Sequence, residues 1–278
     1  MAVTDRVAVS PKFTVTDWGC DVICGFRALV GVQPPLSLLV LVSGVFTVSV
    51  NVRVALNDIS FTVKTGTITG FVGPNGAGKS TTLRCIVGLT MPTSGATTVL
   101  DNSYIDLKNP SNLIGVALDA SRLHSGRSGY STLKIAATIN GVSDSRIWQA
   151  LDECGLTQDE GKRKIKTYSL GMRQRLCIAQ ALLTKPRILI LDEPVNGLDP
   201  QGIMWIRSLL KNFAENEGTV LLSSHLLSEV QKIADHIVMI TNGTILVDKP
   251  LNELLTEGSD LEEVYIKYTE KFSRRFAL

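Results

Sequence analysis

The fold is decided by the stretch Gly73-Pro74-Asn75-Gly76-Ala77-Gly78-Lys79-Ser80, with Thr81 and Thr82 directly behind it. It matches the pattern G-x-x-x-x-G-K-[ST], which joins a strand to a helix through a tight loop. The apolar, β-branched run 68–72 before it predicts a buried strand. The residues 79–88 after it predict a helix, because Leu83, Ile86 and Val87 fall on one face. The loop pattern therefore lies between a predicted strand and a predicted helix, as this type of loop requires.

The chemistry of such a loop explains its residue types. Glycines let successive backbone N–H groups point inward, and the helix N-terminus adds a partial positive charge. Lys79 supplies a full charge for the β- and γ-phosphates of a nucleotide, and the Ser80 hydroxyl can ligate Mg²⁺. The alternative is a glycine-rich turn that merely links the strand to the helix. In this context the pattern indicates a nucleotide-phosphate site.

Composition sets limits on the class of protein. The 278 residues suffice for one large domain or two small ones, and 44% hydrophobic content supports a substantial core. A net charge of +2 gives no electrostatic argument for nucleic-acid binding. The cysteines are odd in number and dispersed, which indicates reduced thiols rather than disulfides or a zinc site. They are Cys20, Cys24, Cys85, Cys154 and Cys177.

The N-terminal segment is the least informative part of the chain. Residues 28–50 contain no charged side chain, which raises the question of a membrane span. Two prolines at 34–35 interrupt this run, and the remainder is shorter than the roughly 20 apolar residues that a span needs. Residues 45–50 are more typical of a strand. We therefore expect residues 1–44 to be a poorly defined extension.

From residue 54 onward, predicted strands and helices alternate, which favours a layered α/β core. The further predicted strands are 56–63, 97–100, 114–118, 188–191, 219–223, 237–240 and 244–247, the last two joined by an Asn242-Gly243 turn. The further predicted helices are 131–141, 145–155, 173–184 and 200–216. The basic run 162–166 is expected to be a solvated face. No internal repeat is visible, so the chain carries a single copy of its nucleotide-binding unit.

A second piece of the phosphate site follows the strand at 188–191. This strand ends in Asp192-Glu193, and strands of open α/β sheets deliver their terminal side chains to the edge where ligands bind. Asp192 is predicted to hold Mg²⁺ directly or through water, and Glu193 to polarise the attacking water. Two acids at a strand end are a weak signal alone. Downstream of the loop at Gly73 they are a strong one.

Three further motifs stand in a fixed order around this strand. They are Tyr168-Ser169-Leu170-Gly171-Met172 before it, Asn196-Gly197-Leu198-Asp199 after it, and Ser223-Ser224-His225 after the next strand. Taken alone, Ser169 fits a helix N-cap equally well, and His225 fits a surface residue at a helix start. In this order, over roughly residues 54–247, the motifs resemble the ATP-binding subunit of ABC transporters.

The resemblance implies a P-loop NTPase fold of the ABC ATPase type, α/β in class, with an inserted helical subdomain at about 119–167 and a small antiparallel β part. The ATP-binding domain would span 45–250, and a C-terminal helical tail would span 251–278. ATP and Mg²⁺ are the implied cofactors. The resemblance gives catalytic roles to Lys79, Glu193 and His225, and adds Ser169, Gly171 and Asp199 to the nucleotide contacts of residues 73–82.

The same resemblance implies a head-to-tail dimer with a second copy of an ATP-binding subunit. Each ATP would lie between residues 73–80 of one copy and residues 169–171 of the other. The signature departs from the usual pattern at Leu170, where Gly is usual, and at Met172, where Gln is usual. Asp119 replaces the usual Gln after the strand at 114–118, and is predicted as a third Mg²⁺ ligand, through water.

The residue that stacks on adenine is not identified by the sequence. In the family an aromatic residue is expected near residues 46–51. Phe46 is the only aromatic there, and a gap-free alignment places Ser49 or Val50 at the position.

The C-terminal tail and the signature resemble those of single-cassette subunits of antibiotic, bacteriocin and multidrug exporters. This implies an ATPase subunit, peripheral on the cytoplasmic face of the cell membrane, that powers export through a separate transmembrane permease subunit. The alternative is an ABC-type ATPase with a regulatory role outside transport. A translation or DNA-repair ATPase would carry a second cassette or a long coiled-coil insertion, and neither is visible. The retained Glu193 argues against a regulator that binds ATP without hydrolysis, and no nucleic-acid partner is expected.

Overall fold

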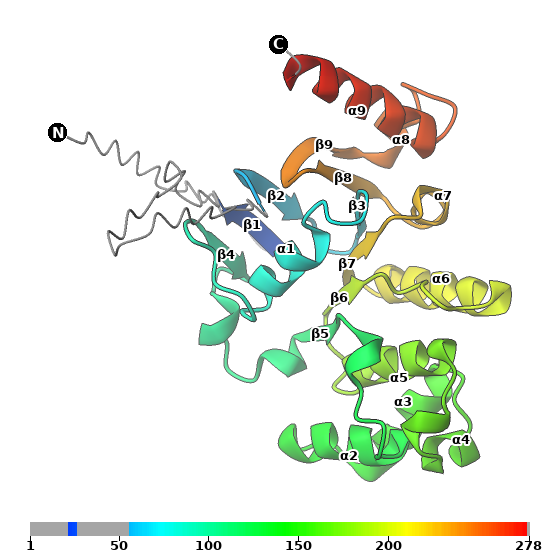
Figure 1. Cartoon of the computed structure of the whole chain (residues 1–278). Helices are drawn as coiled ribbons and strands as arrows, with labels where there is room; N and C mark the ends of the chain where they lie inside the picture. Colours follow the sequence, from blue (N-terminus) through cyan, green and yellow to red (C-terminus); the bar gives the residue numbers. More distant parts are fainter. Residues whose placement is uncertain (1–21, 27–55, 277–278) are drawn as a thin grey trace, which may run out of the picture.

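The structure is a computed structural model that describes residues 22–26 and 56–276, with side chains described for residues 56–271. It contains two sheets, of which the larger runs through the middle and the smaller lies to one side of it, at the left in Figure 1. The larger sheet has six strands in the order β5-β6-β7-β3-β8-β9, of which all but β9 run parallel. The smaller sheet is antiparallel, in the order β2-β1-β4. The strands are β1 (Val22–Phe26), β2 (Ile59–Val63), β3 (Ile68–Val72), β4 (Ala96–Val99), β5 (Ile114–Ala117), β6 (Ile188–Asp192), β7 (Thr219–Ser224), β8 (His236–Thr241) and β9 (Thr244–Pro250).

The helices form separate groups around the larger sheet. The group α2, α3 and α4 gathers beside α5 at the end of the molecule nearest β5, whereas α8 and α9 lie at the other end beside β9 (Figure 1). The helices are α1 (Lys79–Ile86), α2 (Gly129–Ile139), α3 (Asp144–Glu153), α4 (Gln158–Lys162), α5 (Leu170–Leu182), α6 (Pro200–Glu215), α7 (Leu227–Val230), α8 (Leu251–Leu254) and α9 (Leu261–Phe276). Short 3₁₀ turns lie at Tyr104–Asp106, Pro110–Asn112, Ala120–Arg122 and Ile165–Thr167.

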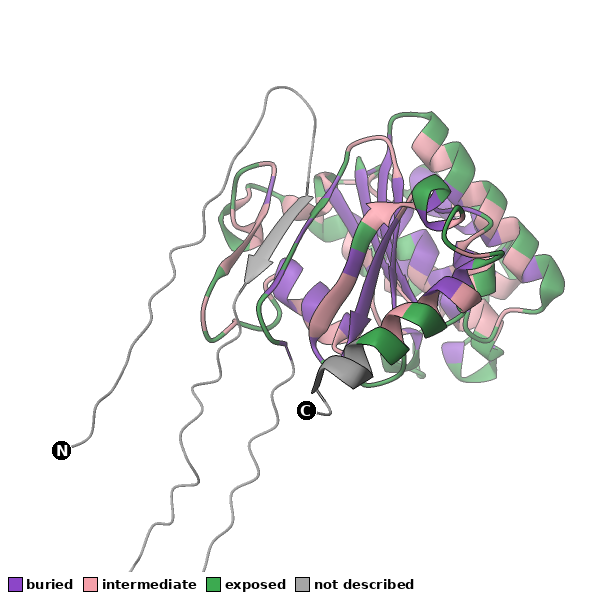
Figure 2. Ribbon diagram, turned by 90° about the horizontal axis from the view of Figure 1, so that it is seen from above, coloured by how far each residue is buried: buried purple, intermediate pink, exposed green. Residues whose placement is uncertain are grey.

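The core lies on both faces of the six-stranded sheet, because side chains along a strand alternate between its faces. In β6, Leu189 and Leu191 join the cluster formed with α5, α6 and α9, whereas Ile188 and Ile190 join the cluster formed with α1 and the smaller sheet. All four of these side chains are fully buried. Figure 2 shows the result, in which buried strands run between helices whose outer faces are exposed. A strand buried on both faces holds its terminal residues rigidly, which matters for the acids that follow β6.

The hairpin between β8 and β9 confirms the prediction from Asn242-Gly243. Both residues have left-handed backbones, with φ of 47° and 75°. Two successive positive φ angles are the geometry of a type I′ turn, which matches the twist of the flanking strands. The residues of this turn therefore direct β9 back along β8, so that β9 joins the described sheet as its one antiparallel strand.

Most predicted elements differ from the observed ones by a few residues at their ends, and three differences have a clear structural cause. Helix α5 begins at Leu170 instead of residue 173, because the Ser169 side chain caps it and accepts a hydrogen bond from Met172 N. Strand β4 ends at Val99, since the next residue, Leu100, has a left-handed φ of 52°. Strand β1 lies in the segment for which no element was predicted, and it pairs between β2 and β4.

The predicted strand at 45–50, and with it the question of a span in residues 28–50 and the adenine-stacking candidates Phe46, Ser49 and Val50, fall outside the described residues. Within the described ranges, no helix combines the length and apolar character needed to cross a bilayer.

Candidate active site

Three loops meet at the carboxyl edge of the six-stranded sheet. They follow β3, β6 and β7, which are neighbours in the sheet and run parallel. The register places Asp192 opposite Ser223 and Val72 opposite Ser224, so the three strands end at the same level. This position is where open α/β sheets bind ligands.

The loop after β3 is held against the sheet by its first glycine. A Cβ on Gly73 would lie 2.1 Å from the carbonyl oxygen of Ile240, so no other residue fits there without displacing backbone. The N–H of Gly73 donates to the carbonyl of Ser224 across 3.3 Å. At the other end of the loop, Gly78 precedes α1 with a φ of 112° and no side chain caps the helix. The N-terminus of α1 therefore opens into the loop, as an anion site requires.

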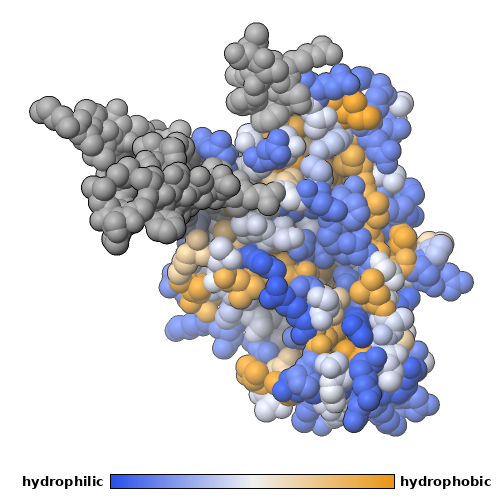
Figure 3. All heavy atoms as spheres, in the orientation of Figure 1, coloured by the Kyte–Doolittle hydropathy of each residue, from blue (hydrophilic) through white to orange (hydrophobic). Residues whose placement is uncertain are grey.

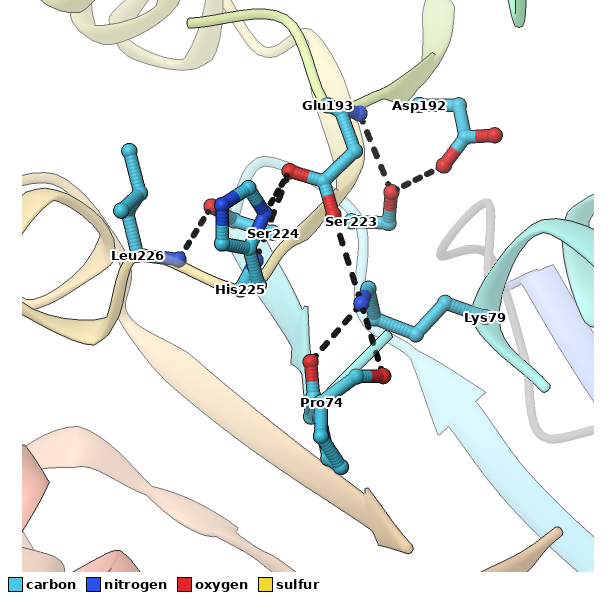
Figure 4. Close-up of polar contacts among 9 residues, drawn as sticks. Pro74, Lys79, Asp192, Glu193, Ser223, Ser224, His225 and Leu226 are labelled. Atoms are coloured by element: carbon cyan, nitrogen blue, oxygen red, sulfur yellow. Dashed lines mark hydrogen bonds and ion pairs between the residues drawn. The ribbon is translucent and has the colours of Figure 1, made fainter. Parts of the chain in front are cut away.

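Lys79 points into the loop that carries it (Figure 4). Its side chain is only 4% exposed, and Nζ donates to the carbonyl oxygens of Gly73 at 2.7 Å and Pro74 at 3.3 Å. The third partner of Nζ is Oε1 of Glu193, also at 3.3 Å. The ammonium is thus satisfied by two carbonyls and one carboxylate, and its role toward the phosphates of a nucleotide stays a prediction.

Glu193 joins the three loops into one cluster. Its Oε1 meets Lys79, while its Oε2 lies 2.8 Å from Nδ1 of His225 and accepts from the backbone N–H of the same residue at 3.4 Å. Because an ionised carboxylate only accepts hydrogen bonds, Nδ1 of His225 donates in this contact. Glu193 also has a left-handed φ of 50°. For a non-glycine residue such a backbone costs about 1–2 kcal/mol, and it persists only where the surroundings hold it.

Two serines at the end of β7 support this cluster. The buried Ser223 hydroxyl donates to Oδ1 of Asp192 and accepts from the N–H of Glu193 at 3.1 Å, so it aligns both acids (Figure 4). The Ser224 hydroxyl accepts from the N–H of Leu226 at 3.0 Å and turns the chain after His225. The motif Ser223-Ser224-His225 predicts a role for His225 alone, and the roles of the two serines emerge only from the structure. Their signal was a pair of hydroxyls where a strand of apolar residues ends.

Asp119 lies after β5, beside the end of β6, but its carboxylate contacts its own loop. Oδ1 accepts from the N–H of Ser121 at 2.9 Å and from its hydroxyl at 2.6 Å, and Oδ2 accepts from Nε of Arg122 at 2.9 Å. The Ser121 hydroxyl is the main cause that holds the pKa of Asp119 below its usual range. The structure therefore shows Asp119 as the cap of a 3₁₀ turn, and its role toward Mg²⁺ stays a prediction.

Three further predicted residues lie at the starts of α5 and α6. Ser169 caps α5, Gly171 lies in the first turn of that helix, and Asp199 caps α6 by accepting from Gly202 N at 2.8 Å. Within the described part of the chain, no hydrogen bond or ion pair joins Ser169 or Gly171 to Lys79. The side chain of Ser169 does form the N-cap that was its simpler interpretation.

Comparison with known proteins finds similar chains among the ATP-binding proteins of transporters. A family model described as ABC transporter matches residues 56–196. The lantibiotic transport ATP-binding protein SrtF of Streptococcus pyogenes is 39% identical over 216 residues, covering 77% of this chain and 90% of that protein. The bacitracin transport ATP-binding protein BcrA of Bacillus licheniformis is 39% identical over 203 residues, covering 72% of this chain and 66% of that protein. A solved ATP-binding subunit of an ABC transporter superposes with a TM-score of 0.69 at 28% identity, over 77% of this chain and 93% of that one.

Proposed function

The chain belongs to the ABC transporter family as an ATP-binding, ATP-hydrolysing subunit, and we propose that it powers the export of an antibiotic, peptide or drug-like compound through a separate membrane subunit. The contact chain Lys79–Glu193–His225 carries the catalytic part of this proposal. It brings a phosphate-binding cation, a base and its partner together from three separate loops. The names of SrtF and BcrA, which refer to lantibiotic and bacitracin transport, support the substrate class.

The geometry suggests how each residue of the cluster acts. Lys79 and the loop N–H groups bind the β- and γ-phosphates, for which Lys79 exchanges its contact with Glu193 for phosphate oxygens. Glu193 then orients the attacking water in line with the γ-phosphate and accepts its proton. His225 keeps the Glu193 carboxylate in place through the contact of its Nδ1. Each side chain thus has a role that its present contacts make possible.

Mg²⁺ fits the oxygen atoms that this site offers. The Ser80 hydroxyl and the Asp192 carboxylate are hard ligands, and Mg²⁺ bound with a nucleotide needs only one or two protein oxygens besides phosphate and water. In the described residues, no group of three or more His, Cys, Asp or Glu side chains could hold a metal ion by itself. Bound there, the ion would neutralise charge on the β- and γ-phosphate oxygens. Asp119 would join it through water only after exchanging its contacts with Ser121 and Arg122.

We propose that the catalytic site is completed by a second copy of the chain or a related subunit. Ser169 and Gly171 begin a 13-residue helix whose first N–H groups favour an anion. Since they do not contact Lys79 of their own chain, their natural anion is the γ-phosphate held by the partner. Asp199, at the start of α6, would face the same interface.

The dimer is tested with Ser169→Arg, which places a bulky cation where the partner's phosphate would approach. ATP binding to the single chain should be retained, while hydrolysis is abolished; for the unaltered chain, the rate per subunit should rise with protein concentration. Ser128→Arg is the matched control, because Ser128 caps α2 by the same kind of bond, from Ser131 N at 3.0 Å. Activity that stays constant on dilution in a demonstrably monomeric sample would refute the composite site, as would normal hydrolysis by Ser169→Arg.

We propose that the chain acts at the cytoplasmic face of the cell membrane, bound to a permease subunit. We expect the permease to co-purify with the chain, and the complex in vesicles to move an antibiotic substrate only with hydrolysable ATP. Glu193→Gln in the same complex serves as the control, since it should leave assembly intact and stop transport. A complex that transports equally well with Glu193→Gln would contradict the proposed function.

A further inference from the structure

The first turn of α5 packs directly against the loop that follows Glu193. A Cβ added to Gly197 would lie 2.4 Å from both Cγ and Cδ2 of Leu170. A Cβ added to Gly171 would lie 3.0 Å from the carbonyl oxygen of Gly197 and 3.5 Å from Cδ2 of Leu198. The two segments are 26 residues apart in the chain, yet they meet so closely that a side chain added at Gly197 would displace Leu170 and one added at Gly171 would crowd the backbone of Gly197.

Leu170 is the side chain that makes this contact. It is an apolar residue, 55% exposed, and its Cγ and Cδ2 are the atoms that lie nearest to the space above Gly197. Glycine is the usual residue at this position of the signature, and glycine has no side chain to reach the loop. The contact is therefore a consequence of the departure that this sequence shows at Leu170.

The loop that Leu170 covers is joined by hydrogen bonds to Glu193. The N–H of Asn196 donates to the carbonyl of Glu193 at 3.1 Å, and the N–H of Leu198 donates to Val195 at 3.2 Å. Glu193 itself has the left-handed φ of 50°, a conformation that depends on its surroundings to persist. Beyond the loop, Asp199 caps α6. A side chain packed against Gly197 therefore contacts the loop that, together with Ser223, holds the backbone of Glu193.

We propose that Leu170 is a positioning residue, which holds residues 194–198 against the start of α5 and so keeps Glu193 oriented for hydrolysis. This inference rests on the proposed function, in which Glu193 acts as the base. Within one chain, the proposed phosphate contacts come from the loop at 73–80, whereas Ser169 and Gly171, on either side of Leu170, would meet only the phosphate of the partner. Loss of the Leu170 contact should therefore slow the chemical step and leave ATP binding unchanged.

The first test is the kinetics of the full chain with Leu170→Ala, which removes Cγ and both Cδ atoms but keeps a good helix former. Because misplacing a catalytic group by a fraction of an ångström to 1 Å costs up to about a hundredfold in rate, kcat should fall roughly tenfold. KM for ATP should change by less than about twofold, because the variant leaves unchanged the groups that bind ATP equally well in the ground state and in the transition state. Leu170→Met, which keeps apolar bulk, should retain kcat. Ile266→Ala in α9 is the matched control, since Ile266 is also 55% exposed.

The second test is a double-mutant cycle with Gly197→Ala. Alanine at a φ of 74° is strained in any background, and in the unaltered chain it also collides with Leu170. In the Leu170→Ala background only the Cβ of residue 170 remains, at 3.1 Å, so the collision is largely relieved. Gly197→Ala should therefore lower kcat by about tenfold or more with Leu170 present, and by less than about threefold with Leu170→Ala, since residues in contact show non-additive effects.

The outcomes separate this inference from the function on which it rests. Equal kcat for Leu170→Ala and the unaltered chain, or equal losses from Gly197→Ala in both backgrounds, would overturn the role of Leu170. If Leu170→Ala lowered thermal stability and raised KM in parallel with the fall in kcat, the role would also be overturned, because the effect would then be purely structural. If the unaltered chain itself showed no hydrolysis that depends on Glu193, the proposed function would fail first.

Discussion

Glu193→Gln tests the catalytic cluster most directly, because it removes one charge and almost no volume. The carboxylate has two partners in the structure, Lys79 at 3.3 Å and Nδ1 of His225 at 2.8 Å. The amide that replaces it can still accept from His225, but it cannot act as a base toward water. The change therefore separates the binding of ATP from its hydrolysis.

The size of both effects follows from the structure. Two unit charges 3.3 Å apart attract by roughly 332/(20 × 3.3), or about 5 kcal/mol, at an effective dielectric constant of about 20. Desolvation of the buried Lys79 and of the partly buried Glu193 offsets most of this attraction. If about 1 kcal/mol of it remains for the phosphates to displace, its loss tightens ATP binding by about fivefold. The loss of a general base lowers turnover by ~10²–10⁴-fold, which is about 3–5 kcal/mol of barrier.

The assay combines calorimetric titration with ATP, steady-state phosphate release, and size-exclusion chromatography after ATP is added. We expect Glu193→Gln to bind ATP at least as tightly as the unaltered chain, to hydrolyse it very slowly and to accumulate as an ATP-bound dimer. Glu229→Gln is the matched control, because Glu229 is equally exposed at 18% and also ion-paired, but lies outside the phosphate cluster. Near-normal turnover in Glu193→Gln, or ATP affinity weakened by about tenfold, would refute the reasoning.

Three further predictions concern Lys79, Glu229 and Cys177. Lys79→Ala should weaken ATP binding in calorimetric titration and abolish turnover together, and undiminished affinity would count against the phosphate loop. Burial raises the pKa of Glu229, but the hydrogen bonds from Arg207 and Lys232 outweigh it and hold the pKa below its ordinary 4.5. Glu229→Gln should therefore lower the free energy of unfolding by about 1 kcal/mol at neutral pH, as measured by urea titration. The difference between the two proteins should vanish as the pH falls below the lowered pKa of Glu229, because the carboxyl is then protonated. A difference that does not depend on pH would contradict this prediction. Burial raises the pKa of Cys177 from 9.0 to about 12, so peptide mapping should show iodoacetamide labelling at pH 8 about tenfold or more slower than in urea, and equal rates would contradict it.

The parts of the fold that the sequence predicted are those that local chemistry determines. The strand before Gly73, the strand before Asp192 and the turn at Asn242-Gly243 have apolar runs bounded by residues that end them. Strand β1 escaped prediction because its place is determined by pairing with β2 and β4, which are distant in the chain. The start of α5 was placed three residues late, since the pattern of buried positions began later than the cap at Ser169.

In the site, too, the residue types could be predicted from local sequence, whereas the contacts between distant residues could not. The types of residue at the three strand ends indicated a phosphate cation, a metal ligand and a base, because each type suits one chemical task. Their mutual contacts could not be read from the sequence, since Lys79 and Glu193 are 114 residues apart and meet only through the order of the strands. The left-handed backbone of Glu193 also has no signal in the sequence, as glutamate rarely adopts it.

Ser169 shows how a structural and a functional role can occupy one side chain. Its hydroxyl oxygen accepts from the N–H of Met172 at 3.2 Å, which uses one lone pair and leaves the proton of the hydroxyl uncommitted within the described chain. That proton can be donated to a phosphate oxygen without breaking the cap. The cap also fixes the hydroxyl at the end of α5, where the helix dipole favours the same anion. The N-cap and the proposed phosphate contact are therefore compatible, and in the proposed dimer the cap would orient the donor before the partner's nucleotide arrives.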